Sequence, residues 1–182
     1  VVADLDEAAA QVTVDRITAA GGTAVATRVD ASDEASVNAA IAFAVATHGG
    51  LHGVHFNAMD MSAGTLGVDG EHDLVTLPLD VWRRTIDVGL TGFLLTARAA
   101  IPHLVEAGGG GIVGTASAAV YASEPIRVAY AATKTGMTAV ARHIASAYGR
   151  HKVRANCVAP GMVLPGAARE TDDPKFLAMM SA

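Results

Sequence analysis

Two residues in one predicted helix have the types and spacing that acid–base chemistry requires. Tyr130 and Lys134 stand four residues apart within 129–149, whose apolar pattern predicts a helix, so both lie on one helix face. An ammonium group beside a phenol favours the phenolate, and such a Tyr can give or take a proton near neutral pH. The same pair on an exposed helix carries no chemistry in most proteins, so the pair alone leaves both interpretations open.

A hydroxyl and a carboxylate each stand at the end of a predicted strand. Ser117 follows a strand at 112–115, and Asp4 ends a strand at 1–4. Parallel sheets bind ligands at the carboxyl ends of their strands, where a Ser can hydrogen-bond a carbonyl or alcohol oxygen and an Asp can accept from ribose hydroxyls. The alternatives are an ordinary loop serine and a helix-capping aspartate, a role that Asp6 could fill equally well.

Short strands and longer helices must position these residues. A glycine pair ends each of the first two predicted helices, Ser32 is the expected cap of the second, and 57–78 reads as a long irregular loop. The alternation predicts an α/β fold, a single Rossmann-type domain over 1–182 with a doubly wound parallel sheet between helices. The expected strands are 1–4, 23–29, 51–56, 112–115 and 153–158, and the expected helices are 6–20, 32–48, 79–107 and 129–149.

Composition excludes several classes of protein. The 182 residues carry 13 Lys and Arg against 18 Asp and Glu, so no basic excess favours a nucleic-acid partner. The chain is 51% hydrophobic, which excludes disorder throughout, and its apolar runs are short and interrupted, so no membrane partner is expected. Seven scattered histidines suggest no metal site. The single cysteine, Cys157, cannot form an internal disulfide, which favours a cytoplasmic location and a core role for this thiol.

The order Ser117, Tyr130 and Lys134, followed by Pro160 and Gly161, resembles the short-chain dehydrogenase/reductase family. The resemblance covers about residues 1–166, and it implies an NAD-dependent oxidoreductase that interconverts a secondary alcohol and a ketone. Other segments follow the family's order and spacing, namely Asp4, 29–30, 57–58, 82–92 and 112–117.

The resemblance implies a role for each matching residue. Tyr130 would be the acid or base at the substrate oxygen, Lys134 would favour its phenolate and hold the nicotinamide ribose, and Ser117 would orient the substrate. Asp4 would bind the adenine ribose and favour NAD over NADP. The positions implied in cofactor binding are Asp4, Asp30, Ala31, Asn57, Ala58, Tyr130, Lys134, Pro160 and Gly161.

Three positions depart from the family pattern around the implied cofactor. Gly89 replaces the usual catalytic Asn, although a water could occupy the vacated space. Met59 replaces a Gly and could crowd the cofactor channel, and Pro165 replaces a Thr that commonly touches the nicotinamide. These departures favour a rival hypothesis, in which the protein is a non-catalytic scaffold or partner subunit.

The family's glycine-rich nucleotide fingerprint has no counterpart in the sequence. The family's first strand, which lies at the centre of the sheet, and its last strand are also unmatched. We therefore expect the sequence to be a segment of a longer chain, truncated at both ends, with an open slot between the strands at 1–4 and 51–56. The Ala- and Leu-rich helices at 79–107 and 129–149 are expected to pack across a two-fold axis in a homodimer or homotetramer.

Overall fold

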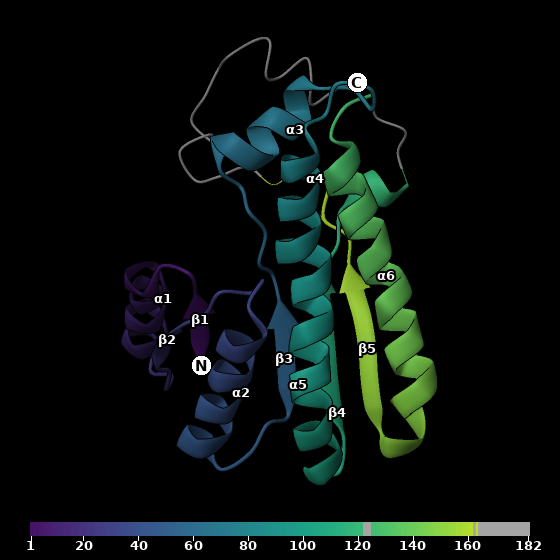
Figure 1. The fold of residues 1–182 in the computed structure, drawn as a ribbon. Helices are drawn as coiled ribbons and strands as arrows, with labels where there is room; N and C mark the ends of the chain where they lie inside the picture. Colours follow the sequence, from purple (N-terminus) through teal and green to yellow (C-terminus); the bar gives the residue numbers. More distant parts are fainter. Residues whose placement is uncertain (122–124, 162, 164–182) are drawn as a thin grey trace.

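The computed structural model describes residues 1–121, 125–161 and 163 (Figure 1). Its described strands are β1 (Val2–Asp4), β2 (Ala26–Arg28), β3 (Gly53–Phe56), β4 (Gly110–Thr115) and β5 (Val153–Val158). Its described α-helices are α1 (Glu7–Ala19), α2 (Glu34–His48), α3 (Val68–Glu71), α4 (Leu79–Ile86), α5 (Gly92–Glu106) and α6 (Val128–Tyr148). The predicted order of strands and helices is therefore confirmed.

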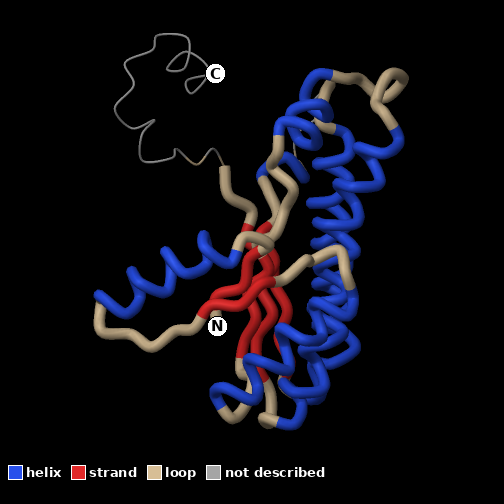
Figure 2. The backbone as a smooth tube through the Cα atoms, turned by 60° about the vertical axis from the view of Figure 1, so that its left-hand side comes forward, coloured by secondary structure: helices blue, strands red, loops and turns tan. Residues whose placement is uncertain are grey.

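All strand pairs in the described part of the chain are parallel, and they form two separate sheets. β1 pairs with β2, while β4 lies between β3 and β5. β1 and β3 are not hydrogen-bonded to each other, so the expected slot lies between them. Figure 2 shows the strands between α1 on one side and the long helices on the other, as a doubly wound α/β fold requires.

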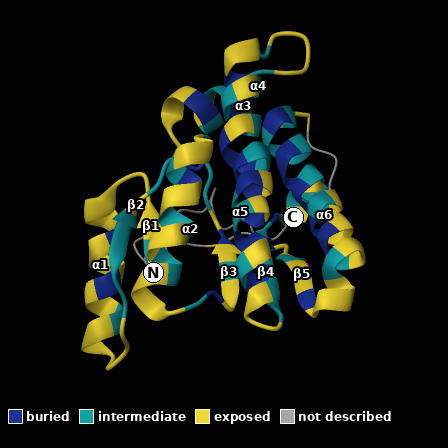
Figure 3. Cartoon of the chain, turned by 60° about the horizontal axis from the view of Figure 1, so that its bottom comes forward, coloured by how far each residue is buried: buried dark blue, intermediate teal, exposed yellow. Residues whose placement is uncertain are grey.

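The core lies where α5 and α6 cover β3, β4 and β5 (Figure 3). Phe93 and Leu104 of α5, Met137 of α6 and Ile112 of β4 are all at most 1% exposed. Burial of side chains of this size contributes about 1.5–3 kcal/mol each to folding. By contrast, β1 and α1 are largely exposed and β2 is mostly half-buried. Tyr130 and Lys134 thus belong to the most deeply packed part of the fold.

The helix ends follow from capping residues, with one correction to the sequence prediction. Asp6 caps α1, since its Oδ1 accepts hydrogen bonds from the N–H groups of Ala8 and Ala9. Ser32 does not cap α2; Asp33 does, because it accepts from the N–H of Ser36 at 2.6 Å. Gly49 ends α2 in the left-handed conformation, at φ 75°, as the glycine pair predicts.

The stretch 57–78 is not wholly irregular, which is a second correction. It contains a π-helical turn, Ala63–Gly67, which packs against α4, followed directly by α3, which contacts α4 and the first turn of α6. The sequence shows no hydrophobic periodicity for these short elements, because contacts with distant segments stabilise them. The stretch is therefore a structured cover beside the start of α6.

α4, a π-helical turn at Asp87–Thr91 and α5 form one continuous helix, Leu79–Glu106. This helix is long and apolar enough to cross a membrane by length and composition, in contrast to what the interrupted apolar runs suggested. Half of its most apolar stretch is nevertheless buried in the fold, as in the core helix of a globular domain. Its π turn is the kind of irregularity that frequently marks functional positions.

Candidate functional site

Tyr130 and Lys134 lie together near the first turn of α6. The Lys134 Nζ is 5.6 Å from the centre of the Tyr130 ring, and the Lys134 side chain is buried. Nζ donates a hydrogen bond of 2.7 Å to the main-chain oxygen of Thr115, at the end of β4. Burial lowers the pKa of Lys134 from its ordinary value, whereas the electrostatic interaction with Cys157 acts to raise it. α6 thus presents an ammonium group, fixed by the sheet, beside a phenol.

Ser117 stands just beyond the end of β4, at the edge predicted from the sequence. Its backbone is extended, its side chain is half-buried, and its Oγ accepts a hydrogen bond from the N–H of Ala119. The next residue, Ala118, donates its N–H to the carbonyl of Pro160 at 2.9 Å. This bond joins the segments after β4 and β5, so Ser117 and Pro160 lie on neighbouring chain segments at the carboxyl edge of the sheet.

A cavity of about 880 Å³ lies between β1 and β3. It is large enough for a nucleotide-sized ligand, since ligand pockets commonly have volumes of about 300–1,000 Å³. Asp4 stands at its edge, exposed, with Oδ1 accepting from the N–H of Asp6 at 3.0 Å. The predicted cofactor residues that line it are Asp4, Asp30, Ala31, Asn57 and Ala58, whereas Tyr130, Lys134, Pro160 and Gly161 do not line it.

A polar network joins the segment after β2 to the segment after β3 at this cavity. Asp30 accepts hydrogen bonds from the N–H and hydroxyl of Ser32, which hold the pKa of the Asp30 carboxyl below its usual value. Arg84 of α4 donates to Ser32 and, at 2.9 Å, to Asp60. Burial alone would raise the pKa of Asp60, but hydrogen bonds from Ser62 and Arg84 outweigh burial and lower it to about 2. The network holds the cavity wall in place.

Protein side chains fill the space directly beside Gly89. A Cβ at Gly89 would lie 2.4 Å from Cγ2 of Thr133 and 2.9 Å from Sδ of Met59. Thr133 is fully buried next to Lys134, and Met59 also lines the cavity. The methyl and thioether groups therefore take the place that a longer side chain at position 89 would need.

Three further expectations concern residues away from these contacts. Pro165 lies outside the described residues. Burial raises the pKa of the Cys157 thiol, which suits a core thiol rather than a nucleophile. Among the described residues, no three His, Cys, Asp or Glu side chains gather as a metal site would require.

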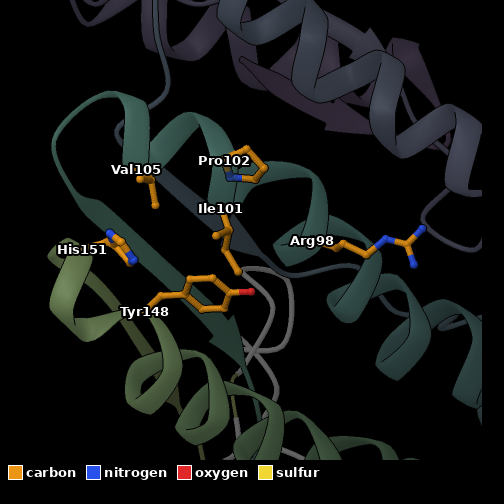
Figure 4. A pocket seen from close by; sticks show the side chains of 6 residues that line it. All are labelled: Arg98, Ile101, Pro102, Val105, Tyr148 and His151. Carbon is orange, nitrogen blue, oxygen red and sulfur yellow. The ribbon is translucent and has the colours of Figure 1, made fainter.

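A second hollow, of about 480 Å³, lies between α5 and the end of α6 and holds none of the predicted site residues (Figure 4). The Tyr148 ring lies toward Ile101, and the Arg98 side chain points away along α5. Arg98 forms an ion pair with Glu34 of α2. This hollow is a groove between helices and does not include Tyr130 or Lys134.

Sequence reasoning missed several residues that hold the site together. Thr115 acts through its main-chain oxygen, which no residue type can reveal. Thr133 and Arg84 read as ordinary helix residues, and Asp69 as one acid in a glycine-rich stretch. Asp69 is fully buried and binds the first turn of α6, 60 residues away. A buried acid in a loop has no sequence signal that distinguishes it from its exposed neighbours.

Comparison with known proteins identifies similar chains. A family model described as enoyl-(acyl carrier protein) reductase matches residues 1–182. The chain is 37% identical over 163 residues to cyclohexanol dehydrogenase of Acinetobacter sp. (strain SE19), covering 90% of this chain and 62% of that protein. It is 34% identical over 163 residues to 2,5-dichloro-2,5-cyclohexadiene-1,4-diol dehydrogenase of Sphingobium indicum, covering 89% and 61%. The chain thus spans about three fifths of the length of the curated relatives that it matches.

Solved structures of dehydrogenases are also similar to this chain. A structure described as a short-chain dehydrogenase/reductase from Burkholderia xenovorans is 31% identical, with a TM-score of 0.79 over 89% of this chain and 62% of that chain. The structure of 7α-hydroxysteroid dehydrogenase with NADH and 7-oxo glycochenodeoxycholic acid is 26% identical, with a TM-score of 0.84 over 98% and 67%. The similarity therefore extends across the parallel sheet and its helices.

Proposed function

Because the chain belongs to the short-chain dehydrogenase/reductase family and its relatives are oxidoreductases, we propose an NAD-dependent enzyme that interconverts a secondary alcohol and a ketone. We assign the proton transfer to Ser117, Tyr130 and Lys134. The observation that carries this proposal is the buried Lys134 ammonium, 5.6 Å from the centre of the Tyr130 ring.

The assigned residues have separate tasks. Ser117 donates its hydroxyl to the substrate oxygen and so orients it at the end of β4. In ketone reduction the Tyr130 hydroxyl gives its proton to that oxygen, and in alcohol oxidation the Tyr130 phenolate takes it. Lys134, held by the Thr115 carbonyl, stabilises the negative charge that develops on Tyr130. Burial excludes water from this ammonium, which strengthens its interaction with the phenolate.

A bound nicotinamide cofactor would accept a hydride in alcohol oxidation and supply one in ketone reduction. Asp4 offers an exposed carboxylate at the cavity edge for the ribose hydroxyls at the adenine end. Lys134 does not line the cavity; it lies beside Tyr130, where we place the nicotinamide end. The carboxylate would repel a 2′-phosphate, so we propose NAD rather than NADP as the cofactor. No glycine-rich turn that could cradle the pyrophosphate is present in the sequence, so residues 1–182 account for only part of the binding site.

We propose alicyclic secondary alcohols as the substrate class. The support is the similarity to dehydrogenases named for cyclohexanol and a cyclohexadiene diol. We favour alcohol oxidation over the enoyl reduction in the family model's description, because the individual relatives are named as dehydrogenases of an alcohol and a diol.

Steady-state absorbance at 340 nm tests the proposal on the full-length protein. Cyclohexanol with NAD⁺ should give NADH, and NADP⁺ should give a kcat/KM at least tenfold lower. Asp4→Asn, which removes the repelling charge, should bring the two kcat/KM values closer together. Asp15→Asn removes a charge from an exposed position of α1 that does not line the cavity, and it should leave the ratio of the two values unchanged. Equal use of both cofactors would refute the assignment of Asp4.

A non-catalytic scaffold is the second candidate, and the filled space beside Gly89 favours it. Titration with NADH distinguishes the two functions. NADH bound to an enzyme should quench the fluorescence of Trp82, whereas a scaffold should give no change in fluorescence. For either function we propose a cytoplasmic homodimer or homotetramer that pairs through α5 and α6, where the groove of Figure 4 lies. Light scattering of the purified protein tests the oligomeric state.

A further inference from the structure

Asp69, a carboxylate outside the proposed catalytic set, binds the helix that carries Tyr130 and Lys134. It lies in α3 and is fully buried. Its Oδ2 accepts a hydrogen bond of 2.8 Å from the main-chain N–H of Tyr130, and its Oδ1 accepts one of 3.2 Å from that of Ala129. Its own carbonyl accepts the N–H of Arg127 at 2.9 Å. Three hydrogen bonds to Asp69 thus join α3 to the start of α6.

These N–H groups are the ones that a helix leaves without partners at its first turn. A capping side chain normally accepts from the second or third helical residue, which in α6 are Ala129 and Tyr130. The residue at the cap position, Arg127, has φ 61° and makes no side-chain capping bond. Asp69 therefore performs the capping from a segment about 60 residues earlier, and its negative charge suits the positive end of the helix dipole.

We propose that Asp69 is a positioning residue for proton transfer, an inference that rests on the proposed function. Its carboxylate fixes the main chain of Tyr130 itself, so the direction in which the Tyr130 side chain leaves the helix depends on Asp69. Catalytic groups act only when they are well placed, and a displacement of about 1 Å can lower the rate about 100-fold. Asp69 itself thereby acts in catalysis through the main chain of Tyr130 and not through a contact with the substrate.

The test compares Asp69→Asn with Asp73→Asn in the full-length enzyme. An Asn side chain keeps one acceptor but places an NH₂ group against the second N–H, so one of the two bonds to α6 is lost. Asp73 is the matched control, because it lies in the same segment and also accepts from two main-chain N–H groups, those of Val75 and Thr76. Asp73 is exposed and its hydrogen bonds remain within its own turn.

Cyclohexanol oxidation and NADH binding are measured for both variants, with kcat normalised to the NADH-binding sites. Asp69→Asn should lower kcat at least tenfold while the Kd for NADH stays within twofold, and hydrogen exchange should be faster in α6 residues 128–134. Asp73→Asn should change none of these quantities. Asp69→Ser, which keeps one small acceptor, should also lower kcat and serves if the Asn variant does not fold.

A merely structural role would reduce the number of folded molecules but leave kcat per NADH site unchanged. A kcat within twofold of wild type in a folded Asp69 variant would therefore overturn this inference alone. An equal loss in Asp73→Asn would overturn it as well. Absence of turnover and NADH binding in the wild type would instead overturn the proposed function, and the inference with it.

Discussion

Replacement of Gly89 by Ala tests whether the Thr133 side chain leaves room for a Cβ atom at position 89, in the π turn of the long helix. Ala in a helix interior is ordinarily more stable than Gly by about 1 kcal/mol. Here the added Cβ would lie 2.4 Å from Cγ2 of Thr133, a β-branched and fully buried side chain with little rotamer freedom. Overpacking costs about 1–3 kcal/mol, and a separation as short as 2.4 Å places this contact in the upper half of that range. After the gain of about 1 kcal/mol is subtracted, we expect a net loss of about 1–2 kcal/mol in the free energy of unfolding.

A double-mutant cycle with Thr133→Ser isolates the responsible contact. Ser lacks Cγ2, and the next atom of residue 133, Cβ, is 3.7 Å from the added carbon, an ordinary contact. Met59 is flexible and can move aside. In the Thr133→Ser background, Gly89→Ala should therefore cost nothing or stabilise by up to about 1 kcal/mol, which gives a coupling energy of about 1–3 kcal/mol.

Urea unfolding followed by circular dichroism measures all four proteins. Equal costs of Gly89→Ala in both backgrounds would refute the packing argument. A Gly89→Ala protein as stable as wild type would refute it too, since the methyl of Thr133 would then not restrict position 89.

Three further predictions concern other contacts. Asp60→Asn should lower the free energy of unfolding by about 1 kcal/mol at pH 7, a value discounted because Arg84 is partly exposed. Since the folded pKa of Asp60 is about 2, this stabilisation is present above about pH 4 and is lost as the pH falls toward 2. Urea unfolding should therefore give the same free energy of unfolding for the wild type and Asp60→Asn near pH 2. Thr133→Val should stabilise by about 1 kcal/mol in thermal unfolding, because the buried Thr133 hydroxyl has no hydrogen-bond partner among the described residues. Gly92→Ala should destabilise by about 1–3 kcal/mol, because its Cβ would lie 2.8 Å from the Ala31 carbonyl; unchanged unfolding would contradict this.

The sequence predicted the elements of the fold well because their signals are local. Glycines at 49 and 108 adopt left-handed conformations that end α2 and α5, and the apolar patterns between such stops define the helices. The pairing of Tyr130 with Lys134 was predictable for the same reason, since both lie on one helix face. The cap of α2 was assigned one residue too early because Ser32 and Asp33 are both good capping residues, and Ser32 bonds to Asp30 instead.

Contacts between distant segments could not be predicted from the sequence. The packing of Thr133 and Met59 against Gly89 joins three segments, and only their assembly brings these side chains together. The bonds from Asp69 to α6 likewise span about 60 residues. Residue types constrain such contacts weakly, because any buried acid needs donors but does not specify which ones.

The turnover of Tyr130→Phe, measured beside Tyr148→Phe, tests the central claim most directly. Both changes remove one phenolic hydroxyl from α6, but Tyr148 lies in the groove at the far end of the helix. With cyclohexanol and NAD⁺, Tyr130→Phe should lose at least 100-fold in kcat while it still binds NADH, because proton transfer contributes about 10²–10⁴-fold. Tyr148→Phe should keep at least half of the wild-type kcat. A Tyr130→Phe enzyme that retains more than a tenth of that kcat would contradict the assigned proton transfer.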